Sequence, residues 1–339
     1  MTGSTAAAIK DAMIDVIIPA YNGARVIAAA IDSALAQTGV LLRVIVVDDG
    51  STDETAAIAG SYGPRVTVVS QANRGVSGAR NTGIAMSQAP YIALLDQDDV
   101  WQPVKLSRQL SLLEAHPAVG LVFTDMVLLE STGRIAEDGY LRSTPPYASL
   151  ERQPVADSAY LLPETLAEAV MRFNFISPST VLLRRAAIND VGGFDEAFRL
   201  CDDADCWLRL LQKWRAIAIE DRLVLSLIWE GNASLNKETL VCERLKMAEK
   251  ALAHPELFPA GARPYFCKER PVSLYRLGIL ALEKSDAKTA RKHLLASFKT
   301  KPCLTTALAL GATLLGVRLR DRLWRAKRTI GLCWAIRVE

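Results

Sequence analysis

The stretch Tyr91-Ile92-Ala93-Leu94-Leu95-Asp96-Gln97-Asp98-Asp99 is an apolar run that ends in three carboxylates within four residues. Such a run is typical of a buried strand that opens into a loop. In open α/β sheets, ligands bind at the carboxyl ends of such strands. Carboxylates at that place most simply hold a hard cation such as Mg²⁺ or Mn²⁺, which takes oxygen ligands and substrate phosphates. A solvated acidic turn is the plainer alternative, and the rest of the sequence must decide between the two.

The sequence on both sides alternates between two patterns. Short apolar runs, typical of buried strands, alternate with segments whose apolar residues recur at helical spacing. We expect strands at residues 14–19, 43–47, 66–70, 91–95 and 119–124, with helices between them. This order predicts an α/β fold with a Rossmann-like, mostly parallel sheet and helices on both faces.

Polar residues follow three of the predicted strands. They are Tyr21-Asn22, Asp48-Asp49 and residues 96–99. Because parallel strands end at the same edge of a sheet, we expect these three loops to converge there. Neither Gly-x-Gly-x-x-Gly after the first strand nor a Gly-x-x-x-x-Gly-Lys-Ser/Thr loop is present, which disfavours ordinary dinucleotide enzymes and P-loop NTPases.

Composition narrows the chemistry further. The 339 residues suffice for one large α/β domain with an appendage. The six cysteines form no Cys-x-x-Cys pair, so we expect free thiols in a reducing compartment. The N-terminal residues lack the apolar core of a signal peptide, and we expect a cytoplasmic protein. The three histidines lie far apart in sequence, which leaves carboxylates as the expected catalytic groups.

Two segments in the second half leave alternatives open. Asp202-Asp203 begins a predicted helix that includes Trp207, so this pair either caps the helix or supplies a general base. Residues 141–163 carry four prolines and little periodicity, and we interpret them as a mobile loop, either a lid or a surface insertion.

The chain resembles the family 2 glycosyltransferases of the GT-A fold. The motifs follow the order of that family, and they are residues 16–22 (VIIPAYN), 47–53 (VDDGSTD), 73–83 (NRG and ARNTG), 96–99 (DQDD) and 193–210 (GFDE and DDADCWLRL). The resemblance implies a nucleotide-sugar donor, with UDP as the default nucleotide, and Mn²⁺ or Mg²⁺ as cofactor.

The resemblance also implies roles for individual residues. For the donor, the nucleotide-sugar contacts would be Pro19 and Tyr21 in the base pocket, Asp49 on the base, Arg80 near the nucleotide or phosphate, and Asp96 near the ribose. Asp98 would bind the metal, and Asp203 would be the catalytic base that deprotonates the acceptor hydroxyl. Three further residues would either contact the acceptor or support the residues that contact it. They are Asp99, Asp202 and Trp207.

Three departures from the family pattern refine this expectation. Relatives often have Glu-Asp where this chain has Asp202-Asp203, which shortens only the neighbour of the base. Trp229 stands where many relatives carry a histidine, so we expect one metal or phosphate ligand fewer. The Gln-x-x-Arg-Trp motif of processive relatives is absent, because residues 212–215 lack its spacing. Addition of a single sugar is therefore favoured over polymerisation.

We expect a flexible N-terminus (1–12), a glycosyltransferase domain (13–235) and a helical, basic C-terminal region (236–339). Within the domain, residues 13–125 would form the nucleotide-sugar half and residues 126–235 the acceptor half.

The C-terminal region carries most of the positive charge. Residues 268–339 contain sixteen Lys and Arg against five Asp and Glu, about +11. An apolar segment at 304–317 is too short to span a bilayer and precedes a basic run at 318–328. This pattern fits either a helix on the inner face of an anionic membrane or a docked helix with a solvated basic face. No nucleic-acid motif accompanies the charge, so we expect no nucleic-acid partner.

The sequence thus favours an inverting, non-processive glycosyltransferase of the hexosyltransferase type that is metal-dependent. It would transfer the sugar to a hydroxyl group of a glycan or lipid-linked acceptor in the biosynthesis of cell-surface polysaccharide. The alternative is a non-catalytic module that binds nucleotide-sugar or glycan in an assembly complex. A sugar-phosphate nucleotidyltransferase would need a Gly-rich, Arg-containing loop after the first strand, which residues 19–23 do not supply.

Overall fold

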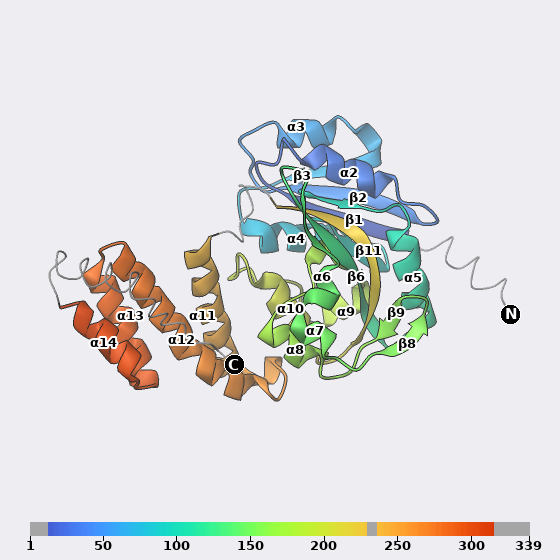
Figure 1. The fold of residues 1–339 in the computed structure, drawn as a ribbon. Helices are drawn as coiled ribbons and strands as arrows, with labels where there is room; N and C mark the ends of the chain where they lie inside the picture. Colours follow the sequence, from blue (N-terminus) through green and yellow to red (C-terminus); the bar gives the residue numbers. More distant parts are fainter. Residues whose placement is uncertain (1–12, 229–235, 315–339) are drawn as a thin grey trace. The chain divides into compact units, whose positions relative to one another are not determined.

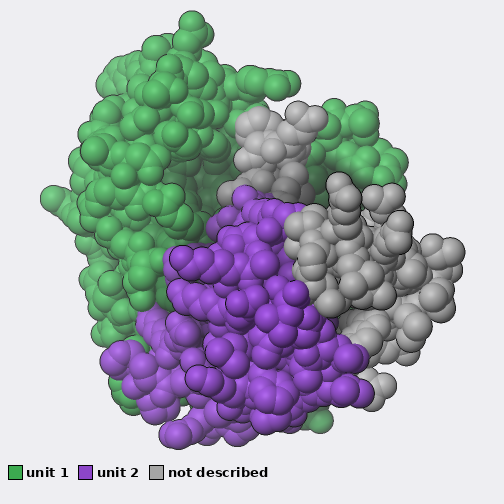
Figure 2. Space-filling model, turned by 90° about the vertical axis from the view of Figure 1, so that its left-hand side faces the viewer, with its two compact units in different colours: residues 1–233, 256–259 green, residues 234–255, 260–339 purple. Residues whose placement is uncertain are grey.

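The computed structural model describes residues 13–228 and 236–314. The chain forms two compact units, residues 1–233 with 256–259 and residues 234–255 with 260–339, which are coloured separately in Figure 2. The predicted flexible N-terminus, the Trp229 position and the basic run at 318–328 lie outside the described residues.

Within the described residues of the first unit, eleven strands form one sheet (Figure 1). Their order is β3-β2-β1-β4-β10-β6-β11-β9-β8, while β5 pairs with β11 and β7 with β6. The strands are β1 Met13–Ala20, β2 Leu41–Asp48, β3 Val66–Ser70, β4 Tyr91–Leu94, β5 Asp99–Trp101, β6 Val119–Glu130, β7 Ile135–Asp138, β8 Gln153–Ala156, β9 Ala159–Leu161, β10 Val181–Arg184 and β11 Arg215–Ile228.

The first four strands are parallel and create a switch point at β1. This strand pairs with β2 on one side and with β4 on the other, and β3 extends the sheet beyond β2. Because successive connections leave β1 in opposite directions, the carboxyl ends of β1 and β4 border a crevice suited to a ligand. Further along, β10 is antiparallel to both β4 and β6, whereas β6 and β11 are parallel. The predicted α/β fold with its largely parallel central sheet is confirmed.

Helices cover both faces of the parallel strands. In Figure 1, α2 (Ile27–Leu35) and α3 (Thr55–Gly60) lie on one side of β1–β3, and α4 (Gly75–Met86) lies on the other. Alternate residues of β1, such as Ile14 and Val16, pack in one apolar core with α2 and with α5 (Lys105–Ala115). The opposite side of β1 presents Ile17 to α4. Strands buried on both faces explain why the sequence shows continuous apolar runs rather than alternation.

Residues 141–163 are not the mobile loop that the prolines indicated. They contain most of α6 (Tyr140–Ser143), all of α7 (Pro145–Ala148), and the strands β8 and β9. Pro145 and Pro146 occupy the first turn of α7, where a missing N–H costs no helical hydrogen bond. Prolines at helix starts therefore gave a loop-like pattern to an ordered segment.

Three more helices complete the first unit: α8 (Leu166–Arg172), α9 (Arg185–Asp190) and α10 (Asp202–Leu210). The second unit contains α11 (Lys237–Ala253), α12 (Ala262–Glu283), α13 (Ala287–Thr300) and α14 (Leu304–Ala312), so the predicted helical region is confirmed. Its helix starts are capped by Asn236, which accepts from the Thr239 N–H at 3.1 Å, and by Asp286, which accepts from the Thr289 N–H at 3.0 Å. Among the described residues, none of the helices has the length and apolarity required to cross a membrane.

The contact between α4 and β1 depends on a missing side chain. A Cβ on Gly83 would lie 2.4 Å from Cγ2 of Ile17, a buried atom that cannot move aside. We expect Gly83→Ala to lower the free energy of unfolding by about 1–3 kcal/mol, because α4 must shift away from the sheet. Urea unfolding of the full chain measures this loss.

Gly60→Ala is the matched control, because nothing lies within 4 Å of a Cβ at the end of α3. This variant should be neutral or more stable by up to about 1 kcal/mol, since alanine favours a helix over glycine. Equal destabilisation by both substitutions would show that the approach of α4 to β1 is not the cause.

Candidate active site

The loops at the carboxyl ends of β1, β2 and β4 are joined by hydrogen bonds. The side-chain amide of Gln97 accepts from the N–H of Tyr21 at 3.0 Å and donates to the carbonyl of Tyr21 at 3.1 Å. Asn22 has a φ of 47°, and its N–H donates to Oγ of Ser51 at 3.0 Å. In return, Oδ1 of Asn22 accepts from the Thr52 N–H at 2.8 Å. The predicted convergence of the three loops is therefore present, and Pro19 lies buried at the end of β1.

Asp49 is buried beneath this surface and holds the start of α4. Its carboxylate accepts from the backbone N–H of Arg74 at 2.9 Å and that of Gly75 at 2.8 Å. It also accepts from Nε2 of Gln71 at 2.7 Å. A carboxylate at a helix start satisfies N–H groups that have no partner within the helix and interacts favourably with the helix dipole. The carboxylate predicted to contact the base thus also fixes the loop that carries Arg74.

Arg80 connects the end of β4 to the start of α10. Its guanidinium is almost completely buried; Nη2 donates to Asp96 at 2.7 Å and Nη1 donates to Asp202 at 2.5 Å. The group also lies 5.4 Å from the centre of the Phe194 ring. Burial raises the pKa of Asp202, and the positive charge of Arg80 opposes that shift. The observed role of Arg80 is therefore to hold two carboxylates that are 106 positions apart.

Asp99 differs from the two neighbouring aspartates. It is buried, and burial together with the charges of Asp98 and Asp96 raises its pKa to about 8. Hydrogen bonds from Ser179 and Ser226 oppose the shift. The Ser179 hydroxyl also accepts from the Asp96 N–H at 2.9 Å, which fixes the turn between β4 and β5.

Asp203, in the first turn of α10, is placed to exchange a proton near neutral pH. Its side chain accepts from Nδ2 of Asn174 at 2.8 Å and from the Ala204 N–H at 2.7 Å. Burial and the neighbouring Asp202 raise its pKa to about 7, while Arg80 lowers it. Trp207 lies fully buried one turn further on, and its Nε1 donates to the Ile176 carbonyl at 2.9 Å. Trp207 therefore anchors α10 rather than contacting a ligand directly.

The acidic loop has the donor chemistry for a divalent cation. Asp96 and Asp98 are both half-buried, and their proximity to Asp99 concentrates negative charge that a cation would neutralise. Among the described residues, no three His, Cys, Asp or Glu side chains gather closely enough to hold a metal by themselves. Magnesium and manganese sites commonly use only one or two carboxylates and complete their shell with substrate phosphates and water. The residues present fit such a site.

Comparison with known proteins shows which family the chain resembles. Residues 15–140, which are 126 of the 339 residues, match the family model described as Glycosyl transferase family 2. Over these residues the chain is similar to glycosyl transferase family 2. Two curated relatives are an uncharacterized glycosyltransferase of Rickettsia prowazekii, 31% identical over 60% of each chain, and the succinoglycan biosynthesis protein ExoO of Rhizobium meliloti. ExoO is 34% identical over 55% of this chain and 52% of its own, so the chain matches little more than half the length of these relatives.

Solved structures show the same fold as this chain. S. aureus TarS 1–349 in complex with UDP-GlcNAc superposes with a TM-score of 0.59 over 93% of this chain and 92% of that protein, at 16% identity. The mannosyltransferase PcManGT from Pyrobaculum calidifontis, in complex with GDP-Man and Mn²⁺, gives a TM-score of 0.55 over 93% and 84%, at 21% identity. The predicted GT-A fold class is confirmed.

The structure brings most of the proposed family 2 residues to one edge of the sheet and adds others. Asp96, Asp202 and Asp203 are linked through Arg80, while Asp49 and Tyr21 belong to the adjoining loops. Sequence reasoning missed the roles of three polar residues in the same region: Gln97, Asn174 and Ser179. Gln97 lies inside the acidic motif, so its place in the sequence was a signal. No local pattern marks Asn174 or Ser179, because only the fold brings them next to Asp203 and Asp96.

The ion pairs of Arg80 with Asp96 and Asp202 should contribute more to stability than the other interactions of the site. Arg80→Met leaves Asp202 buried without its cation, and we expect a loss of about 3–5 kcal/mol in the free energy of unfolding at pH 8. The loss should shrink at pH 5, because burial raises the pKa of Asp202 and, without the opposing charge of Arg80, this carboxyl is more readily protonated and then needs no cation. Chemical unfolding of the full chain at both pH values measures the effect.

Arg74→Met provides the control. Arg74 also pairs across to the second half, with Glu196, but both side chains are substantially exposed. Its substitution should cost less than about 1 kcal/mol at either pH. If both variants lost the same stability with the same pH dependence, burial of the Arg80 pairs would not be the cause.

Proposed function

We propose that this chain is an inverting, non-processive glycosyltransferase that moves a hexose from a nucleotide-sugar, by default UDP-linked, to a glycan or lipid-linked hydroxyl in polysaccharide biosynthesis. The observation that carries the proposal is Asp203. It is a half-buried carboxylate whose pKa is raised to about 7 and which connects through Asp202 and Arg80 to the loop at the end of β4. The match of residues 15–140 to the family 2 model and the name of the relative ExoO support the reaction class and the pathway.

The donor would occupy the crevice at the carboxyl ends of β1 and β4. Tyr21, 48% exposed, and Pro19 would border the nucleobase, and Asp49 would accept from it. Asp49 uses its two oxygens for three donors, which leaves acceptor capacity for a fourth. Asp96 would face the ribose, and Arg80 would place Asp96 and contribute positive charge toward the phosphates. TarS and PcManGT, which share the fold, are described with UDP-GlcNAc and GDP-Man.

Asp203 would act as the general base. Its carboxylate takes the proton from the acceptor hydroxyl as the oxygen attacks the anomeric carbon, and the bond from that carbon to the diphosphate breaks. A single in-line displacement inverts the anomeric centre. Asn174 holds the Asp203 carboxylate in place through the 2.8 Å hydrogen bond, and Trp207 fixes the helix that presents it.

Asp98, with Asp96 beside it, would hold Mn²⁺ or Mg²⁺. A bound divalent cation supplies Lewis-acid neutralisation of the charge that develops on the diphosphate leaving group. The Mn²⁺ described with PcManGT supports this choice of ion.

We further propose a cytoplasmic location with peripheral membrane contact. That part rests on the charge of the C-terminal region, whose basic run lies outside the described residues.

The pH profile tests the role of Asp203. Because the base must be ionised, kcat/KM should rise with pH through about 7 and then level off. Asp203→Asn should reduce transfer by about 10²–10⁴-fold. Asn174→Ala removes a donor that stabilises the carboxylate, so the rise should move to higher pH. Initial rates of nucleotide release with acceptor present measure all three, with Asp32→Asn on α2 as control.

The metal assignment is tested by nucleotide binding and by turnover. With EDTA, UDP should no longer raise the melting temperature, and added Mn²⁺ should restore the shift. Asp98→Asn should raise the Mn²⁺ concentration that gives the half-maximal shift in melting temperature by about 10–100-fold or more. Loss of a residue that only hydrogen-bonds to a metal ligand already lowers metal affinity by about that factor. Asp157→Asn, on an exposed turn, should behave as wild type.

Full transferase activity in both Asp98→Asn and Asp203→Asn would refute the assignments. Metal-dependent binding without turnover across many acceptors would favour the non-catalytic module.

A further inference from the structure

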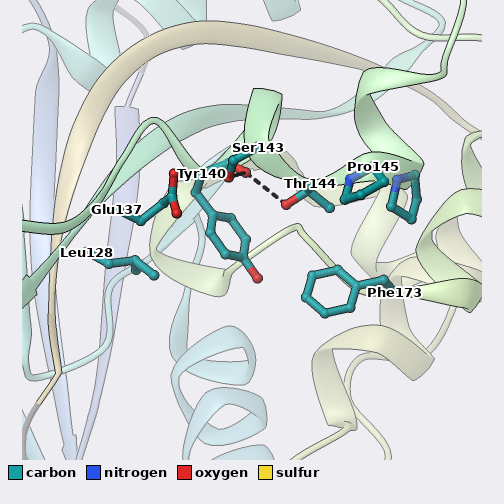
Figure 3. Close-up of a pocket in the computed structure, with 8 residues that line it drawn as sticks. Leu128, Glu137, Tyr140, Ser143, Thr144, Pro145 and Phe173 are labelled. Carbon is teal, nitrogen blue, oxygen red and sulfur yellow. Dashed lines mark hydrogen bonds between the residues drawn. The ribbon is translucent and has the colours of Figure 1, made fainter. Parts of the chain in front are cut away.

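A pocket of about 430 Å³ lies between α6, α7 and the end of α8 (Figure 3). Two aromatic rings, Tyr140 and Phe173, lie next to one another there with their centres 6.4 Å apart. The rest of the lining is mixed: it comprises Leu128, Glu137, Ser143, Thr144, Pro145 and Pro146. Phe173 is 41% exposed although it is a large aromatic residue. The volume falls in the range of about 300–1,000 Å³ that small-ligand pockets occupy.

The pocket adjoins the proposed base. Asn174, which follows Phe173 in the chain, donates its amide hydrogen to Asp203 at 2.8 Å. Burial raises the pKa of Tyr140, and the charge of Asp203 adds to that shift. Because the Tyr140 ring lies beside that of Phe173, both aromatic residues border the surroundings of this carboxylate. A molecule whose hydroxyl reaches Asp203 would therefore place its adjoining part against these rings.

The wall that carries Tyr140 is held in place by two carboxylates. Glu220, on β11, accepts from Arg142 at 3.0 Å, from Arg152 at 2.9 Å and from the Tyr147 hydroxyl at 3.1 Å. Asp125, on β6, accepts from the Leu141 N–H at 2.9 Å and so caps the start of α6. The side chains of both acceptors are buried, so the pocket exists before a ligand arrives.

We propose that this pocket binds a pyranose ring of an oligosaccharide acceptor, namely the sugar next to the one that carries the reacting hydroxyl. The inference rests on the proposed function and assigns its acceptor as a glycan. A pyranose has apolar C–H faces and hydroxyl edges, and the pocket offers aromatic faces together with Glu137, Ser143 and the Tyr140 hydroxyl. A polyprenyl chain would need a continuous apolar channel, which these polar groups interrupt.

The test uses the full chain with Mg²⁺ and UDP. Saturation-transfer NMR is recorded with mono- to tetrasaccharides of glucose, galactose and N-acetylglucosamine, and in parallel with farnesyl phosphate. We expect binding of oligosaccharides of two or more residues, weakened about tenfold by Tyr140→Leu and by Phe173→Leu. Tyr140→Phe keeps the ring and should retain most of the affinity. Tyr62→Leu, an aromatic substitution on the opposite side of the sheet, should change nothing.

Three outcomes would overturn the inference: no oligosaccharide binds, binding is unchanged in both leucine variants, or farnesyl phosphate binds with the same dependence on Tyr140 and Phe173. The UDP affinity of every variant, measured by calorimetry, separates this inference from the proposed function. If a variant loses oligosaccharide binding but keeps its affinity for UDP, the substitution has affected the proposed acceptor pocket alone. Failure of wild type to bind any nucleotide would refute the donor assignment instead.

Discussion

The guanidinium of Arg80 is the interaction on which the site depends, because it pairs with two carboxylates that the chain supplies from distant positions. Asp96 arrives at the end of a parallel strand, and Asp202 begins a helix in the other half. Without a buried cation between them, their burial would be unfavourable. The same charge lowers the pKa of Asp203, which burial and Asp202 raise. A single residue of α4 thus holds two carboxylates in place and moderates the rise in the pKa of a third.

Much of the fold could be predicted, since strands buried on both faces leave a strong local signal. The runs that became β1, β2 and β4 are largely apolar, with Asp15 in β1 and Arg43 in β2 as charged exceptions, and each is followed by polar residues at the same edge of the sheet. Convergence of those loops follows from parallel pairing alone. The convergence of the three loops was therefore predictable from the sequence, apart from the side-chain pairing between them.

The surroundings of Asp203 and the acidic loop were harder to predict, because their contacts join residues that have no common local pattern. Asn174 reaches Asp203 across 29 positions, and Ser179 reaches Asp96 across 83. The prolines of α7 were read as loop residues although they occupy positions that a helix start tolerates. The buried carboxylate of Asp49 was expected to face a ligand, and its bonds to the start of α4 carry no sequence signature.

The anchoring of residues 139–161 has a consequence for how this protein can diversify. Asp125 and Glu220 belong to the sheet, and they hold this segment through the Leu141 N–H and three side chains. Side chains between those anchors can be exchanged without changing the strands or the crevice beneath β1. If the pocket binds the acceptor as proposed, new acceptor preferences could arise by substitution or grafting of one short segment, while the loops proposed to bind the donor stay unchanged.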